Sequence, residues 1–247
     1  MVGTGDLWLV DDHCATIVHF PKTIQSVLGK RLSSSEYGNQ TGYADRYPFY
    51  DLFLFLFMMK IILASQSPRR KQLLEWAEIP FEVVAKETDE TFPKGLRVEE
   101  AAIYIATQKA FAVQPFVNTD VVILAADTIV VLEGRIIGKP RDRDEAIRIL
   151  CDLSGQKHVV ITGVVIIKGT KKISFADSTD VYFHELSRKQ IEFYVDKYKP
   201  YDKAGAYAIQ EWIGVVGIKS VAGDFYNVMG LPVSRVVREL KNFVADP

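Results

Sequence analysis

Apolar runs and apolar stripes at helical spacing alternate along the chain from residue 60 onwards. Residues 61–63 form a short apolar run, which predicts a buried strand. Residues 121–132 form a nearly continuous run, typical of a strand covered on both faces. Residues 97–113 carry an apolar stripe at helical spacing. Further strands are expected at 81–85, 158–168, 173–186 and just before a glycine-containing loop at 220–231, and further helices at 68–76, 144–153, 188–198 and 232–243.

The segment between the first strand and the first helix breaks a local rule. Ser67 is a good helix cap, and Pro68 suits the first helical position. Arg69 and Arg70 then place two cations in the first turn, where the helix dipole favours anions. One interpretation is a bound polyphosphate held by backbone N–H groups, serine hydroxyls and both guanidiniums. The alternative, arginines that merely point into solvent, has equal weight from this segment alone.

Two charged residues fall on apolar faces. Lys109 lies on the stripe of its helix, four residues after Ile105, where a lysine is rare unless it is paired or used, although snorkelling at the helix end is an alternative. Asp127 stands in the middle of an apolar strand, so it needs a metal, a cation or a water-lined cleft. Glu90 lies in an acidic loop, where a single acid is usually solvated. The small residues 204–206 suit close approach of the backbone to a ligand.

Length and charge set broad limits on function. The 247 residues can bury a large core as one domain or two lobes. A net charge of −1 gives no support for nucleic acid or a membrane as a bulk partner, so any basic site must be local. Cys14 and Cys151 lie far apart in no metal-ligand spacing, which fits a reduced, cytoplasmic compartment.

Residues 1–58 differ from the rest of the chain and end in an apolar run, PFYDLFLFLFMM. That run is shorter than the roughly 20 residues that a helix needs to span a bilayer. Three interpretations compete: an extra packing element, a weak membrane-surface anchor, or translated upstream sequence with the start at Met58 or Met59. The last is favoured, because an ordered strand begins directly after Lys60. We therefore expect a segment at 1–58 and a functional domain at 59–247.

Phosphate chemistry accounts best for the unusual charges. The chain lacks a Walker A motif, GxGxxG, HExxH, CxxC and GxSxG. Phosphoryl chemistry needs cations or metal around charged oxygens, and a carboxylate that orients or deprotonates water. A loop acid together with a strand acid can also hold Mg²⁺. Together these features favour hydrolysis of a phosphoanhydride. The residues concerned are Ser67, Arg69, Arg70, Glu90, Lys109, Asp127, Lys139 and Lys203.

Several motifs resemble those of the Maf family of nucleoside triphosphate pyrophosphatases. They are LASQSPRR, the acid in TDE, the lysine in QKA, AADT, GKP, HVVITGV, DKAGAYAIQ and NVMGLP, and they cover residues 60 to about 240 in the family's order. The resemblance implies a mixed α/β fold with a twisted sheet, flanking helices and two lobes around a central cleft, similar to inosine triphosphatases. It also implies cleavage between the α and β phosphates, a divalent metal such as Mg²⁺ or Mn²⁺, and a homodimer.

The resemblance assigns roles to individual residues. Asp127 would be the general base, and Glu90 would help it to hold metal or water. Arg70, Thr128 and Gln210 match the branch that resembles the dTTP/UTP pyrophosphatases, and an amide supplies both a donor and an acceptor for a pyrimidine edge. The substrate-binding residues implied are Ser65, Ser67, Arg69, Arg70, Lys109, Thr128, Lys139, Lys203 and Gln210.

The resemblance therefore predicts a cytoplasmic hydrolase that removes dTTP, UTP or modified pyrimidine nucleotides from nucleotide pools. Two alternatives stay open from the sequence. One is a pyrophosphatase for another substrate class, such as 7-methyl-GTP. The other is a nucleotide-binding regulator of septum formation, which would bind without turnover. The carboxylate of Asp127 in an apolar strand argues against a pure binder.

Overall fold

The computed structural model describes residues 7–11, 14–18 and 59–245. The chain divides into two compact units, Met1–Asp51 and Leu52–Pro247. In the first unit β1 (Leu7–Asp11) pairs antiparallel with β2 (Cys14–Val18).

The apolar run that ends in Met58 and Met59 lies outside the described residues, apart from Met59 itself. Its packing, its relation to a membrane and the predicted boundary at residue 58 therefore stay predictions. No helix within the described ranges combines the length and the apolar character that a bilayer crossing requires.

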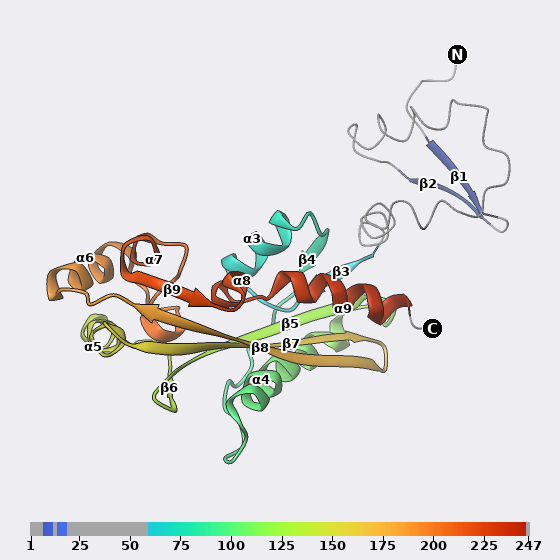
Figure 1. Ribbon diagram of the computed structural model, residues 1–247. Helices are drawn as coiled ribbons and strands as arrows, with labels where there is room; N and C mark the ends of the chain where they lie inside the picture. The colour runs from blue at the N-terminus through green and yellow to red at the C-terminus, as the bar shows by residue number, and fades with distance from the viewer. Residues whose placement is uncertain (1–6, 12–13, 19–58, 246–247) are drawn as a thin grey trace. The chain divides into compact units, whose positions relative to one another are not determined.

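The second unit is built on a seven-stranded mixed sheet, in the order β4-β3-β5-β7-β8-β9, with β6 paired to β5 (Figure 1). β3 is parallel to both of its neighbours, and the other pairings are antiparallel. The predicted mixed α/β fold is therefore confirmed. The strands are β3 (Ile61–Leu63), β4 (Phe81–Val83), β5 (Val122–Leu132), β6 (Arg135–Ile137), β7 (Lys157–Lys168), β8 (Lys171–Phe183) and β9 (Ile218–Ala222).

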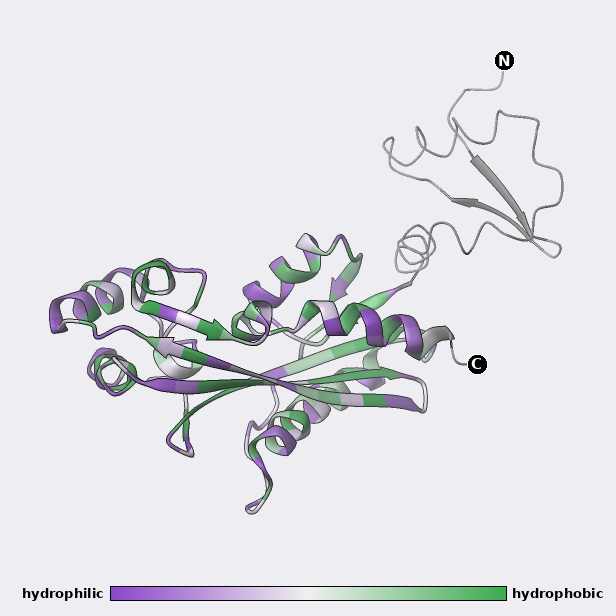
Figure 2. Ribbon diagram, in the orientation of Figure 1, coloured by the Kyte–Doolittle hydropathy of each residue, from purple (hydrophilic) through white to green (hydrophobic). Residues whose placement is uncertain are grey.

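Helices cover the sheet on both faces, with α4 on one face and α3, α8 and α9 on the other (Figure 1). The central strands β5 and β7 are therefore apolar almost throughout (Figure 2). The helices are α3 (Pro68–Trp76), α4 (Val98–Val113), the 3₁₀ turn η1 (Gln114–Phe116), α5 (Arg143–Leu153), α6 (Arg188–Tyr198), the 3₁₀ turn η2 (Ala204–Ala206), α7 (Trp212–Gly217), α8 (Phe225–Met229) and α9 (Val233–Ala245).

The starts of α5, α6 and α8 follow local capping chemistry, and those of α3 and α7 do not. Ser187 and Gln190 form the predicted capping box at the start of α6. The Asp142 side chain accepts a hydrogen bond from the Glu145 N–H at the start of α5. The prediction for Ser67 was wrong in detail: it occupies the cap position of α3, but its side chain makes no capping hydrogen bond. Its N–H instead donates to Ser65 Oγ at 3.2 Å, which tightens the turn.

The region after residue 211 was predicted least well, because a strand and a loop were expected where two short helices occur. α7 contains IGVVG, whose β-branched and glycine residues favour a strand over a helix. α8 has only five residues and begins where the Asp224 side chain accepts hydrogen bonds from the N–H groups of Tyr226 and Asn227. Local preference at these positions is outweighed by packing against the sheet.

Helix α4 lies unusually close to the sheet at Gly163. An ideal Cβ added to Gly163 would lie 2.4 Å from backbone atoms of Ala102 and Ile103, so only glycine fits there. Gly163 is the cross-strand partner of Asp127 on β7. The same close contact that removes a side chain from Gly163 therefore brings α4, and with it Lys109, onto the face of β5 that carries Asp127.

Candidate active site

The site lies at an interruption in the pairing of one edge of β5. On this edge β3 pairs with β5 at residues 122–124, and β6 pairs with it at residues 130–132. The stretch between them carries Asp127 and Thr128, whose side chains point to opposite faces of the sheet because they are successive residues. Both residues line one cavity of about 620 Å³. The interruption therefore lets a single cavity reach side chains from both faces.

Lys109 holds two carboxylates together on the α4 side of the cavity. Its Nζ lies 2.5 Å from Asp127 Oδ1 and 2.8 Å from Glu90 Oε1. The side chains of Lys109 and Asp127 are only 15% and 13% exposed. Of the two interpretations of Lys109, pairing is thus the correct one. The pair also explains how a carboxylate is kept within an apolar strand.

Glu90 joins a second cation to this group. Its Oε2 accepts a hydrogen bond from Lys139 Nζ at 2.9 Å. Partial burial alone would raise the pKa of Glu90, but the hydrogen bonds and charges of Lys109 and Lys139 lower it to about 2. Glu90 is therefore ionised throughout the neutral range, and although its side chain is 45% exposed it is paired with two lysines.

Across the cavity, Asp202 forms ion pairs with both Arg69 and Lys203, as Glu90 does with Lys109 and Lys139. Its carboxylate lies 2.7 Å from Lys203 Nζ and 3.6 Å from Arg69 Nη1. Partial burial would raise the pKa of Asp202, but the hydrogen bond and charge of Lys203 and the charge of Arg69 lower it. Lys203 is buried, whereas the Asp202 side chain is 60% exposed. A carboxylate thus links two cations on each side of the cavity.

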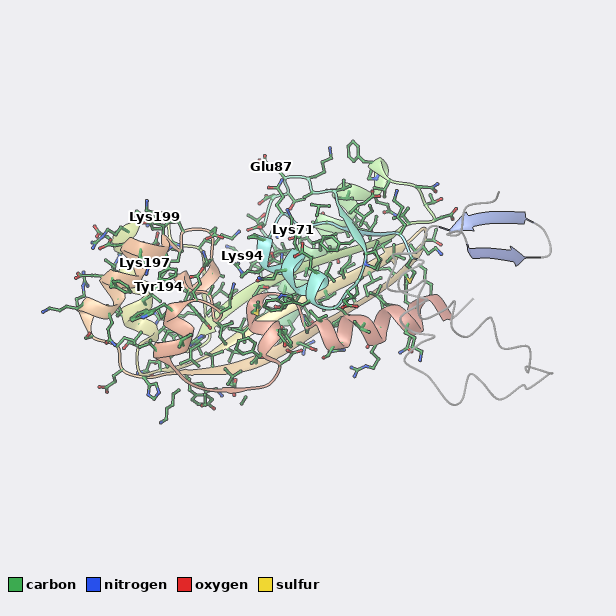
Figure 3. All side chains as sticks on the ribbon, turned by 90° about the horizontal axis from the view of Figure 1, so that it is seen from above. Lys71, Glu87, Lys94, Tyr194, Lys197 and Lys199 are labelled. Carbon is green, nitrogen blue, oxygen red and sulfur yellow. The ribbon has the colours of Figure 1, made fainter. Side chains whose placement is uncertain are left out.

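Two residues next to Lys203, Glu211 and Tyr194, were not predicted as part of the site. Glu211 Oε1 lies 3.6 Å from Lys203 Nζ, and Glu211 Oε2 accepts a hydrogen bond from the Tyr194 hydroxyl. Tyr194 also accepts a hydrogen bond from the Ala208 N–H at 3.2 Å. Figure 3 shows Tyr194 with Lys197 and Lys199 in one part of the molecule, and Lys71 with Glu87 in another. No short motif marks Tyr194, because its partners lie on a different segment.

Arg70 differs from its neighbour Arg69. It is buried, its Nε donates to Gly230 O at 2.8 Å, and its two Nη atoms donate to Ser65 Oγ at 3.1 Å and Thr128 Oγ1 at 3.0 Å. Burial lowers the pKa of Arg70, although Asp127 acts in the opposite direction. Arg70 therefore does not merely point into solvent, because it joins β5, α3 and the residue after α8.

A buried polar pair lies behind the cavity wall. Tyr207 lines the cavity, and its hydroxyl lies 2.8 Å from Nε2 of His158. The two rings also contact Phe183 edge to face. Burial raises the pKa of Tyr207 and lowers the pKa of His158 to about 4. Both groups are therefore neutral near pH 7, and they were not singled out from the sequence.

The structure brings together all but one of the predicted site residues. Gln210 is exposed and is not among the residues that line the cavity. The wall also includes apolar residues that the sequence did not single out, among them Val160, Val228 and Met229. The predicted residues that line the cavity are Ser65, Ser67, Arg69, Arg70, Glu90, Lys109, Asp127, Thr128, Lys139 and Lys203.

The carboxylates of the cavity suit a hard divalent cation. Asp127 and Glu90 converge on one ammonium group, so their oxygens lie within reach of a common cation. Mg²⁺ prefers such oxygen ligands and is commonly held by one or two carboxylates together with substrate phosphates. In the described ranges, His, Cys, Asp and Glu residues form no group of three that could hold a metal by themselves.

A mixed α/β domain with paired cations and carboxylates around a single cavity defines a phosphate-handling class of protein. The family model described as "Maf-like protein" matches residues 60–243, and the chain belongs to this family. A dTTP/UTP pyrophosphatase of Phocaeicola vulgatus is 49% identical over 183 residues, covering 74% of this chain and 95% of the relative. A dTTP/UTP pyrophosphatase of Bacillus cereus is 48% identical, covering 76% of this chain and 98% of the relative.

Solved structures of two other proteins align with the chain at low identity. The Ham1 protein of Staphylococcus aureus is 15% identical with a TM-score of 0.41, covering 74% of this chain and 98% of that protein. A dITP/XTP pyrophosphatase of Mycobacterium abscessus is 16% identical with a TM-score of 0.32, covering 52% of this chain and 76% of that protein.

Proposed function

We propose that the chain hydrolyses nucleoside triphosphates, dTTP and UTP above all, to the monophosphate and pyrophosphate. The observation that carries the proposal is the arrangement of Asp127, Lys109 and Glu90 in a cavity whose other side presents Arg69 and Lys203. Relatives that are 48% and 49% identical over most of the domain and are named dTTP/UTP pyrophosphatase support it. The reaction would remove unwanted nucleotides from the cytoplasmic pool, and the working protein would be a homodimer.

Asp127 is the proposed general base. Lys109 pairs with Oδ1 and holds the carboxylate in place, so Oδ2 is the oxygen that accepts a proton from water. The water oxygen attacks the α-phosphorus, the bond to the oxygen that bridges the α and β phosphates breaks, and pyrophosphate leaves. Arg69, Lys139 and Lys203 stabilise the negative charge of the phosphates during this step.

A divalent metal, Mg²⁺ or Mn²⁺, would be held by Glu90 and Asp127, with phosphate oxygens and water as its other ligands. Such an ion would supply further charge stabilisation at the phosphates. Because Lys109 lies between the two carboxylates, its ammonium must share them with the ion or move towards a phosphate oxygen.

Hydrolysis in ¹⁸O-labelled water tests the proposed bond cleavage. Attack on the α-phosphorus places the label in the monophosphate, as mass spectrometry of the products would show. Label in pyrophosphate or in inorganic phosphate would contradict the proposal, and so would intact triphosphate after incubation with Mg²⁺ or Mn²⁺. The Asp127→Asn variant serves as the matched control for contaminating activity.

A further inference from the structure

Glu211 stands at the start of α7 but does not cap it. A side chain at this position commonly accepts a hydrogen bond from the first N–H groups of the helix. The Glu211 side chain makes no such bond, and its carboxylate is directed instead to Tyr194 on α6 and to Lys203 just before η2. Glu211 is not among the residues that line the cavity, whereas Lys203 is. The contact of Glu211 with the cavity wall therefore runs through Lys203.

Tyr194 holds one oxygen of this carboxylate. The Ala208 N–H donates to the Tyr194 hydroxyl oxygen at 3.2 Å, and a backbone N–H can only donate. The hydroxyl proton is therefore free for Glu211 Oε2, to which it donates. Burial raises the pKa of Tyr194, so the hydroxyl keeps its proton at neutral pH. The ring is fully buried and stacks on Tyr198, with the two centroids 5.0 Å apart, so the donor is fixed in place.

The other oxygen, Glu211 Oε1, lies 3.6 Å from Lys203 Nζ. The Lys203 side chain is only 10% exposed, and an ammonium shielded from water to this extent is costly without a counter-charge. Asp202 supplies a second counter-charge at 2.7 Å, but its side chain is largely exposed and lines the cavity. The Glu211 side chain is 21% exposed and is tied to α6 through Tyr194. Lys203 thus has one counter-charge that can turn into solvent and one that is held.

The two counter-charges have different roles when an anion enters the cavity. Phosphate oxygens and Asp202 compete for the same ammonium, and the exposed carboxylate of Asp202 can turn away from it. Glu211 cannot follow, because its other oxygen is bound to Tyr194. The charge of Lys203 therefore stays compensated, and its ammonium stays at the cavity wall. A cation that is held in place beforehand stabilises a phosphate at a lower cost than one that must first be ordered.

We propose that Glu211 is a positioning residue: fixed by Tyr194, it holds the Lys203 ammonium at the cavity wall while a phosphate of the substrate replaces Asp202. The inference rests on the proposed function, and it adds how one of the phosphate-binding cations is held. It also separates two carboxylates that a count of charges would treat alike, because Asp202 opposes phosphate binding and Glu211 supports it.

The test compares Glu211→Gln with Asp202→Asn, since each removes one negative charge beside the same ammonium. The quantity measured is the dissociation constant of UTP that carries a methylene group between the α and β phosphates, by titration calorimetry with Mg²⁺ present. This analogue cannot be cleaved at that bond, so binding is measured apart from turnover.

The two variants should change this dissociation constant in opposite directions. The amide in Glu211→Gln has a single oxygen, and when that oxygen accepts from Tyr194 the NH₂ group faces the Lys203 ammonium. We expect the dissociation constant to rise about tenfold in Glu211→Gln. It should fall about twofold in Asp202→Asn, because a competitor of the phosphates is lost.

Further variants show whether the effect passes through Lys203. In a Lys203→Met background, Glu211→Gln should not raise the dissociation constant further, because the ammonium that it positions is absent. Tyr194→Phe should raise the constant about threefold, since it releases the carboxylate. Glu192→Gln on α6, whose carboxylate pairs with Arg188, is the matched control and should leave the constant unchanged. Urea unfolding of each variant checks that it is folded.

A dissociation constant that stays the same or falls in Glu211→Gln would overturn the inference, and so would an equal rise in the Lys203→Met background. Either result leaves the pyrophosphatase proposal intact if the wild type releases pyrophosphate from UTP. Binding in the expected order without turnover of any triphosphate would reject hydrolysis and keep the inference. Failure of the wild type to bind the analogue would overturn the inference as well.

Discussion

The two faces of β5 give the cavity two regions of opposite character. On the α4 face and across the cavity mouth, Asp127, Glu90 and Asp202 hold cations through ion pairs that are partly open to solvent. On the other face, hydrogen bonds run from Arg70 through Thr128 and Thr162 to the backbone oxygen of Asn227, and of these residues all but the partly exposed Thr128 are buried. We call these the charged region and the hydroxyl chain. Ion pairs near solvent can exchange partners with phosphates, whereas a largely buried chain of hydrogen bonds is costly to rearrange.

The comparison is tested most strongly by removing the carboxylate of Asp127. Asp127→Asn should lower kcat for UTP about 10³-fold, within the range expected for loss of a general base. The free energy of unfolding should change far less, because the amide retains an oxygen for Lys109. Steady-state kinetics and urea unfolding measure the two quantities. Activity close to that of the wild type would remove Asp127 from the mechanism.

As the pH falls, protonation of the buried His158 should lower the free energy of unfolding before Glu90 in the charged region is protonated. The folded-state pKa of His158 is about 4, below its ordinary value of 6.5, so the unfolded chain binds a proton that the folded chain does not. Stability should therefore fall as the pH drops from about 6.5 to about 4, by up to about 3 kcal/mol. His158→Gln should flatten this dependence in urea unfolding, whereas substitution of the exposed His184 should leave it in place. An equal pH dependence in both variants would contradict this account.

Over the same pH range, Glu90 in the charged region should stay ionised. The pKa of Glu90 is lowered to about 2, so the stability that its ionised form contributes is present above the ordinary value near 4.5 and is lost only as the pH falls towards 2. Glu90→Gln should therefore lower the free energy of unfolding by a constant amount above about pH 4.5, and the difference from the wild type should shrink as the pH falls below that value.

Asn227→Ala tests how far the Asn227 side chain stabilises the fold. Its Nδ2 donates to Val160 O at 3.0 Å and to Thr179 Oγ1 at 2.9 Å, and the residue is fully buried. Asn227→Ala should lower the free energy of unfolding by about 2 kcal/mol, since it leaves a buried carbonyl and a cavity. Urea unfolding measures this loss. A stability equal to that of the wild type would show that the side chain does not support the chain.

Asp202→Asn should have the smallest effect on the kinetics, and it should strengthen the interaction with UTP rather than weaken it. Because its exposed carboxylate competes with phosphates for Arg69 and Lys203, Asp202→Asn should lower KM for UTP about twofold at low salt. The difference should shrink as salt screens the charges. A rise in KM would show instead that Asp202 positions the two cations.

The sequence predicted the charged region better than the hydroxyl chain. Lys109 and Asp127 stand out because charges on apolar faces are rare, and a turn rich in serine and arginine marks the segment before α3. In the hydroxyl chain, Arg70 and Thr128 were named through the family resemblance, but Thr162 and Asn227 leave no such signal, since threonine is common in strands and Asn227 resembles a loop residue. Arg70 Nε bonds to Gly230, which lies 160 residues away in the chain. Such contacts depend on strand register and on the short α8, and local patterns specify neither.

The sequence also predicted most of the helices and strands of residues 59–245, but not all of them. Long apolar runs, the Ser187 capping box and the α4 stripe identified the main elements. α7 and α8 were missed because their sequences favour other structures locally. The exposed position of Gln210 depends on the turn between η2 and α7, which residue spacing alone does not determine.

The most direct measurement is pyrophosphate release from UTP by the wild type and Asp127→Asn, with Mg²⁺ present. If the charged region carries the reaction, the wild type should release pyrophosphate and Asp127→Asn should have a kcat about 10³-fold lower. Pyrophosphate release by Asp127→Asn at close to the wild-type rate would contradict the central claim.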